Sequence, residues 1–163
     1  TDVLLEKKVK DLFQDSKVLS ETELLSRANI KYERYANQAI IDSKTRSHRA
    51  RKQYLPSINK YLGKLANEIK DLKEAGIPVP LTTFDTAKKI SALLEEAGKA
   101  TDVLDGLLEE AKNFHGRDLA IFSRDQLLPA RHALRSPIDQ LELLVSKEDW
   151  PVPSYGDLLF HII

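Results

Sequence analysis

The sequence of residues 1–163 predicts an all-α protein with a single helical domain: an elongated antiparallel three-helix bundle, with an additional short N-terminal helix and an extended C-terminal tail. Of the 163 residues, 42% are apolar and 31% charged, against only 6 glycines and 7 prolines, which is typical of long amphipathic helices. Apolar residues recur at steps of three and four, as one face of a helix requires. No alternating run of β-branched residues predicts a strand.

A short amphipathic helix is expected over about residues 2–14. Its apolar positions, at helical spacing, are Leu4, Leu5, Val9, Leu12 and Phe13. Ser20 then stands three residues before Glu23, which is the spacing of a capping box. This pair predicts the start of the next helix.

That next helix is expected to be one very long helix over residues 21–75, bent at Pro56. Between the cap and Pro56 the chain has neither glycine nor proline. A proline inside a helix removes one backbone donor and bends it there. The segment from Gly76 to Pro80 holds one glycine and two prolines and is the clearest break in the chain.

A second long helix is expected over residues 83–114, with Thr82 or Thr83 as its cap. The apolar stripe that it turns toward other helices is Ala87, Ile90, Leu94, Ala97, Thr101, Leu104, Leu108 and Ala111.

A third long helix is expected over residues 118–147, where Pro129 and Pro137 should bend or interrupt it. Its stripe is Ala120, Leu127, Arg131, Leu134, Ile138, Leu141 and Val145. Residues 148–163 then form a tail that contains a Trp-Pro sequence.

Three long helices with short connections predict an antiparallel arrangement. Counting from the Gly76 loop at 1.5 Å per residue, Pro56 and Pro129 fall at a similar height, roughly 30 Å from the loop. The same count leaves residues 21–43 with neither the second nor the third helix beside them. We expect this overhang to be covered by the N-terminal helix or by another polypeptide. Within the chain, the expected contacts join Leu4, Leu5, Leu12 or Phe13 to Tyr32, Tyr35, Ala39 or Ile40.

The residues that catalysis or metal binding would need are missing or badly spaced. The absence of cysteine excludes disulfides, thiolate metal sites and cysteine nucleophiles. No two histidines stand four residues apart, as zinc ligands on one helix face do. We expect all four to be solvated surface groups: His48, His115, His132 and His161. No Gly-x-Ser-x-Gly elbow or glycine-rich phosphate loop occurs, so we expect no catalytic, cofactor-binding or metal-binding residue in this chain.

Charge and hydropathy argue against two classes of partner. The 25 Lys and Arg residues balance 25 Asp and Glu residues, so the chain has no net positive charge that would attract polyanions in general. The strongest basic cluster forms a short ring rather than a stripe, so we expect no nucleic-acid partner; it consists of Lys44, Arg46, His48, Arg49, Arg51 and Lys52. No apolar run approaches the roughly 20 residues that span a bilayer. We therefore expect no membrane partner and a cytoplasmic location.

Two arginines interrupt the apolar stripes. Arg46 falls between Ser43 and Ala50 on the long helix, and Arg131 falls between Leu127 and Leu134. A buried, unpaired guanidinium is very costly, so each arginine should extend to water, find a carboxylate or meet another chain. Arg131 should be the more strained of the two, because it lies inside the span of the bundle.

The most specific stretch is the last one, residues 150–160, which reads Trp-Pro-Val-Pro-Ser-Tyr-Gly-Asp-Leu-Leu-Phe. It closely resembles the ending of type III glutamine synthetases, with Ser154 in place of the usual threonine. Earlier pieces resemble the same family in the same order: residues 12–24, Ala50–Pro56, Arg124–Ala130 and 134–142. The resemblance covers essentially the whole chain.

The departures from the family pattern include the two arginines that interrupt the apolar stripes. The pattern leads us to expect methionine at Arg46, Arg49 and Arg131, and Pro137 falls where the family's helix continues. The resemblance itself implies an accessory C-terminal helical domain, separated from the catalytic body of a bacterial ligase of nitrogen metabolism.

Enzymes of this family join ammonia to glutamate with ATP and a divalent metal, Mg or Mn, at sites upstream of the C-terminal helices. Similar members assemble as stacked hexameric rings. The implied partners are therefore the catalytic domain of the same chain and neighbouring subunits of a homo-oligomer, and the implied role is packing or assembly. The residues leave one alternative open, a free-standing helical protein-interaction module that binds a partner helix through the overhang.

Overall fold

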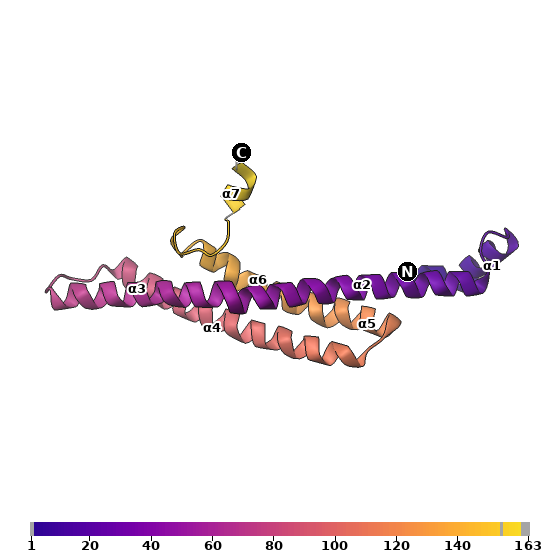
Figure 1. Cartoon of the computed structure of the whole chain (residues 1–163), viewed down its shortest axis with the longest axis horizontal. Coiled ribbons are helices and arrows are strands. Elements are labelled where there is room, and N and C mark those ends of the chain that lie inside the picture. The colour runs from indigo at the N-terminus through magenta and orange to yellow at the C-terminus, as the bar shows by residue number, and fades with distance from the viewer. Residues whose placement is uncertain (1, 154, 161–163) are drawn as a thin grey trace. The chain divides into compact units, whose positions relative to one another are not determined.

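The computed structural model describes residues 2–153 and 155–160, and its regular structure is entirely helical, with no strand among those residues (Figure 1). The predicted all-α class is confirmed, whereas the three-helix bundle stays a prediction. The elements in order are η1 (Asp2–Leu5), α1 (Lys7–Asp15), α2 (Glu21–Arg49), η2 (Ala50–Tyr54), α3 (Leu55–Glu74), α4 (Leu81–Glu110), η3 (Ala111–Asn113), α5 (Gly116–Phe122), η4 (Ser123–Leu127), α6 (Leu128–Glu142) and α7 (Tyr155–Phe160). None of the described helices is both long enough and apolar enough to cross a membrane.

The described residues form two compact units. The first combines the chain up to Lys44 with residues 106–129, and the second combines residues 45–105 with the chain from Ala130 onward. The helices α2 and α4 each contribute residues to both units.

In the first unit, the N-terminal segment covers the start of α2, as expected for the overhang. Ala28, Tyr32 and Ala36 of α2 form a buried cluster with Ala120 of α5, and Leu5 of η1 packs against it. The contact with Ala120 corrects one expectation, because the third predicted helix does reach residues 21–43. The small alanines explain this, since they let a second helix approach α2 closely.

A polar triad fastens the same segment. The Nε of Arg117 donates to Oδ1 of Asp2 at 3.0 Å and its Nη2 donates to Oδ2 at 3.3 Å. The hydroxyl of Tyr32 donates to the same carboxylate. The Arg117 hydrogen bond, followed by that of Tyr32, lowers the pKa of Asp2 to about 2.

The predicted capping box at the start of α2 is confirmed. The backbone N–H and the hydroxyl of Ser20 both donate to Oε2 of Glu23 at 2.8 Å, and the N–H of Glu23 donates back to Oγ of Ser20 at 3.3 Å. These bonds satisfy backbone donors that a helix start otherwise leaves open.

Along α2 and α3 the buried residues form one row of mostly small side chains. It consists of Leu24, Ala28, Tyr32, Ala36, Ala39, Ser43, Ser47, Ala50, Ile58 and Leu65. Several members are eleven residues apart, a spacing of three helical turns that keeps them near one face. The sequence placed Arg46 in this row, but Ser47 takes the buried position and Arg46 is half-buried beside it. A serine hydroxyl is buried at far lower cost than a guanidinium.

A π-turn precedes Pro56, where the sequence predicts a bend. The N–H of Leu55 bonds to the carbonyl of Ala50, five residues earlier, and Pro56 follows. The N–H of Leu128 bonds in the same way to Ser123, just before Pro129. A proline lacks an N–H and its ring clashes with the preceding turn, so a wider turn accommodates it.

The third predicted helix differs most from expectation. It is divided into α5, η4 and α6, and α6 ends at Glu142 rather than at Lys147. Pro137 does not interrupt α6, because its ring is fully buried and that burial offsets the lost hydrogen bond. The tail is not simply extended either, since α7 forms within it.

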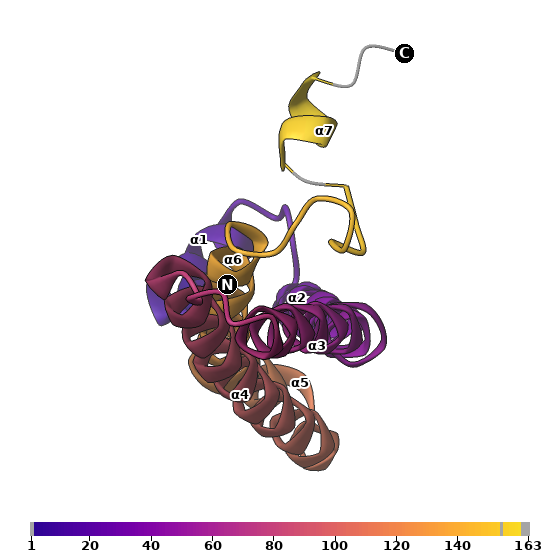
Figure 2. The same ribbon diagram turned by 90° about the vertical axis from the view of Figure 1, so that its left-hand side faces the viewer.

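In the second unit, α3 and α4 form an antiparallel hairpin around the turn at residues 75–80 (Figures 1 and 2). Gly76 has φ +69°, a conformation that glycine adopts without strain. The predicted threonine cap of α4 is wrong, because the helix begins earlier, at Leu81. The carbonyl of Pro80 accepts the N–H groups of Thr83 and Phe84.

The predicted stripe of α4 is confirmed at its centre. The buried residues are Ile90, Ala97, Thr101, Leu104, Leu108 and Ala111. The one buried hydroxyl in this stripe is satisfied locally, since Thr101 Oγ1 donates to the carbonyl of Ala97 at 2.7 Å.

We expect Asp2→Asn to lower the melting temperature near neutral pH and to reduce the acid sensitivity of the first unit. Because folding lowers the pKa of Asp2 from 3.8 to about 2, its contribution is present above about pH 4 and is lost as the pH falls toward 2. Thermal unfolding of both proteins between pH 2 and 7 tests this. Asp11→Asn, at an exposed position of α1, is the control, and equal curves for wild type and Asp2→Asn would contradict the prediction.

The expectation that Arg131 is more strained than Arg46 stays a prediction. Arg131 is half-buried and its Nε is shielded from water, so replacement by a flexible apolar side chain recovers desolvation energy. Arg131→Met should raise the free energy of unfolding by about 1 kcal/mol, and Arg46→Met should do less. Urea unfolding measures both, and an unchanged or lower midpoint for Arg131→Met would show the seam assignment to be wrong there.

Candidate functional site

The described residues include no cluster of side chains of the kind that holds a metal ion. No group of three or more His, Cys, Asp or Glu side chains within residues 2–153 and 155–160 could hold a metal ion. His48, His115 and His132 are exposed, as expected, and His161 lies outside the described residues. The features that distinguish this chain are therefore a polar network between helices and an uncovered apolar tail.

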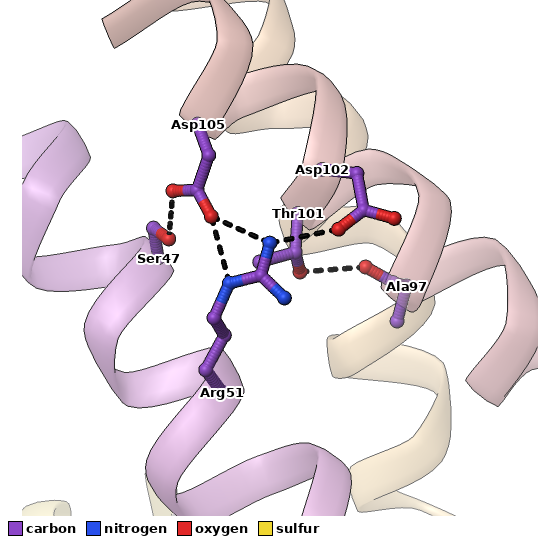
Figure 3. A network of polar contacts seen from close by, with 6 residues as sticks. All are labelled: Ser47, Arg51, Ala97, Thr101, Asp102 and Asp105. Atoms are coloured by element: carbon purple, nitrogen blue, oxygen red, sulfur yellow. Dashed lines mark hydrogen bonds and ion pairs between the residues drawn. The ribbon is translucent and has the colours of Figure 1, made fainter. Parts of the chain in front are cut away.

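The polar network joins the end of α2 and the π-turn η2 to α4, within the second unit (Figure 3). Arg51 Nε donates to Oδ2 of Asp105 and Arg51 Nη2 donates to Oδ1 of Asp102, both at 2.7 Å. The hydroxyl of Ser47 donates to the other oxygen of Asp105. The network closes the α3–α4 hairpin at the end opposite its turn.

The two carboxylates raise the pKa of Arg51, with the hydrogen bond to Asp102 as the larger cause and that to Asp105 next. The Arg51 side chain is 46% exposed, so water and salt screen these ion pairs. The positive charge of Arg51, a member of the basic cluster, is thus paired with carboxylates of the same chain.

A hollow of about 580 Å³ lies where the tail meets α6 and the π-turn η2. It is lined by Arg49, Gln53, Tyr54, Ile138, Asp139, Glu142, Trp150, Pro151, Val152, Pro153 and Leu158. Most of this lining is apolar or aromatic, as in binding clefts generally. The rings of Tyr54 and Trp150 are stacked, with centroids 5.4 Å apart and planes 30° apart.

Hydrogen bonds fix the turn between α6 and this part of the tail. Lys64 Nζ on α3 donates to Oδ1 of Asp149 at 2.6 Å, and Ser146 Oγ donates to Oδ2 at 2.8 Å. Both bonds lower the pKa of Asp149, that from Lys64 being the larger cause. Trp150 is thereby held at the edge of α3.

Three large apolar side chains that line the hollow, or stand next in sequence to a residue that lines it, are exposed to water. Leu143 is 85% exposed, Leu158 68% and Leu159 75%. The Nε1 atom of Trp150 is buried and has no hydrogen-bond partner among the described residues, an arrangement that costs about 1–3 kcal/mol in a folded protein. These features define what we call the tail face: the hollow together with Leu143, Leu158 and Leu159.

Sequence reasoning found part of this face. It singled out the Trp-Pro string at residues 150–153 and the unexpected Arg49, and the structure brings both to the hollow. It missed the stacking partner Tyr54, although Tyr54 stands just before a Leu-Pro pair that marks the π-turn. No sequence signal distinguished the exposed leucines from core leucines.

Comparisons with known proteins find this chain similar to glutamine synthetases. The family model for the glutamine synthetase C-terminal domain matches residues 1–73. The type-3 glutamine synthetase of Dictyostelium discoideum is 25% identical over 98% of the chain, and the glutamine synthetase of Bacteroides fragilis is 23% identical over 88%. A glutamine synthetase of Butyrivibrio fibrisolvens is 25% identical over 93%. No solved structure matches the chain.

The resemblance to type III glutamine synthetases seen in the sequence is thus confirmed. The chain spans only 21–22% of the length of these three relatives. The matches therefore concern one region of a much longer protein.

We expect the Arg51–Asp105 pair to contribute measurable but modest coupling. In a double-mutant cycle of Arg51→Met and Asp105→Asn, the coupling free energy should be about 0.5–1 kcal/mol in low salt, as for partly exposed pairs. It should shrink in 1 M NaCl, because the pair is accessible to ions. Urea unfolding supplies the values. Additive effects of the two substitutions in low salt would show that the pair does not hold the hairpin.

Proposed function

We propose that this chain, which is similar to type III glutamine synthetases along most of its length, is the accessory C-terminal helical domain of such an enzyme. The observation that carries the proposal is the extent of the similarity. It covers 88–98% of this chain but only about a fifth of each relative. The proposed role is packing or oligomer assembly, with no catalytic residue of its own.

The chemistry of the proposed parent enzyme is the ATP-dependent ligation of ammonia to glutamate. It needs a divalent metal, Mg or Mn, which carboxylate ligands hold. Among the described residues no group of side chains could hold a metal, so the proposal assigns the metal and the nucleotide to the rest of the longer protein. The helices would act on that part only through packing.

The proposed partners are the catalytic domain of the same polypeptide and neighbouring subunits of a homo-oligomer in the cytoplasm. An exposed apolar face of the kind formed by Leu143, Leu158 and Leu159 supports a packing role, because such faces commonly mark contact sites. The expected overhang contributes less to this role, since Leu5 and Ala120 cover it within the chain.

A free-standing interaction module remains the alternative, and the exposed leucines of the tail are the observation in its favour. A catalytic domain upstream in the same reading frame would exclude it. Its absence from that frame would exclude the accessory-domain proposal.

We expect the purified chain to form no glutamine from glutamate, ammonia and ATP above a buffer control. We expect the longer protein without these 163 residues to assemble less completely than the full-length protein. Light scattering coupled to gel filtration measures the assembly. Glutamine formation by the chain alone, or an identical oligomer with and without it, would contradict the proposal.

A further inference from the structure

We infer that the tail face is a docking surface for a segment of the longer polypeptide that lies outside these 163 residues, and that this segment presents an apolar side chain beside an acidic one. The inference rests on the proposed function and specifies its partner. It is drawn from the exposure, the unmet hydrogen bond and the charge of this face.

The first observation is the exposure of its leucines. Leu143, Leu158 and Leu159 are 85%, 68% and 75% exposed. Burying the apolar surface of a leucine is favourable, so a partner that covers these side chains gains from it. All three lie in the part of the chain that follows α6, within the second unit.

The second observation is the state of Trp150. Its ring stacks on Tyr54 at the hollow, while its Nε1 is buried and finds no acceptor in residues 2–153 and 155–160. A buried indole N–H usually has a partner. A small rearrangement of the tail on docking would give this N–H an acceptor, such as a backbone carbonyl of the incoming segment.

The third observation is the charge at the hollow. Arg49 is exposed and forms no ion pair with any described residue. The carboxylates of the lining are already engaged, since Asp139 accepts from Arg135 at 2.9 Å and Glu142 interacts within the chain. The charge left to recruit a partner is therefore positive, which favours an acidic neighbour beside the apolar anchor.

The size of the face favours a tethered partner over a second copy of the chain. Three leucines offer little apolar area to offset the translational and rotational freedom that two free molecules lose on association. A segment of the same polypeptide meets the face at a high effective concentration. The relatives carry more than three quarters of their length outside the matched region, which provides such a segment.

A second apolar site, at the hairpin turn, is the natural control. Leu81 is 73% exposed, almost the same as Leu159. Leu81 lines neither of the two hollows formed by the tail, and neighbouring Phe84 is partly covered by Lys88, whose Nζ lies 4.5 Å from the ring centre. Leu81→Asp therefore matches Leu159→Asp in side chain, exposure and change.

The experiment titrates the separately expressed remainder of the longer protein into this chain, up to concentrations high enough to stand in for the tether, and follows the emission of Trp150, the single tryptophan of the sequence. A Trp150→Phe chain gives the baseline, and circular dichroism checks that each variant is folded. Leu159→Asp and Arg49→Glu should each weaken binding about tenfold or more, which corresponds to 1.4 kcal/mol. Leu81→Asp should leave it within about twofold of wild type. Leu158→Asp replaces Leu159→Asp if the latter misfolds.

Each outcome decides one point. Binding by wild type that Leu159→Asp and Arg49→Glu leave unchanged, or that Leu81→Asp alone weakens, would overturn the docking surface while the accessory-domain proposal stands. No binding by wild type, together with unchanged assembly of the truncated enzyme, would overturn both. A dimer of the isolated chain that Leu159→Asp dissolves would assign the face to a second copy and would overturn the inference.

Discussion

The structure depends on the row of small buried side chains along α2. Ala28, Ala36, Ser43 and Ser47 are almost completely buried, and their size lets neighbouring segments approach the helix closely. Such a row buries little apolar area per residue, so hydrophobic burial alone stabilises the fold less than a leucine-rich seam would. The remaining stability must come from packing between helices and from polar contacts at their ends.

Those polar contacts lie beside the row of small residues and join it to other segments. In the first unit, Asp2 ties the N-terminal segment to Tyr32 and Arg117. In the second unit, Arg51 ties the π-turn to α4. Both units thus combine close packing of small residues with an ion pair between segments. Neither of these contacts involves the exposed leucines of the tail. The tail is left available for a contact outside the chain.

Helical periodicity was enough to predict the all-α class, the capping box at Ser20 and the buried stripe of α4. It could not choose between Arg46 and the adjacent Ser47 for the buried position, because neighbouring residues of a helix differ by only 100° in direction. The buried residue is Ser47, whose hydroxyl donates to Asp105, a contact that periodicity does not reveal. It also gave the place of Pro56 but not the π-turn, since that depends on how the carbonyls before a proline are accommodated. The exposed leucines of the tail face could not be predicted from periodicity, because the exposure of Leu159 depends on what surrounds the residue.

The most direct measurement compares amide hydrogen exchange of the isolated chain with that of the same residues in the full-length protein. Slow exchange along α2 in both samples would show that the chain folds around its own row of small residues. Additional protection in the full-length protein is expected over residues 143–153 and α7, where the tail face lies. Equal exchange of the tail in both samples, or new protection confined to the turn at residues 75–80, would contradict the central claim that the chain folds by itself and presents its tail for docking.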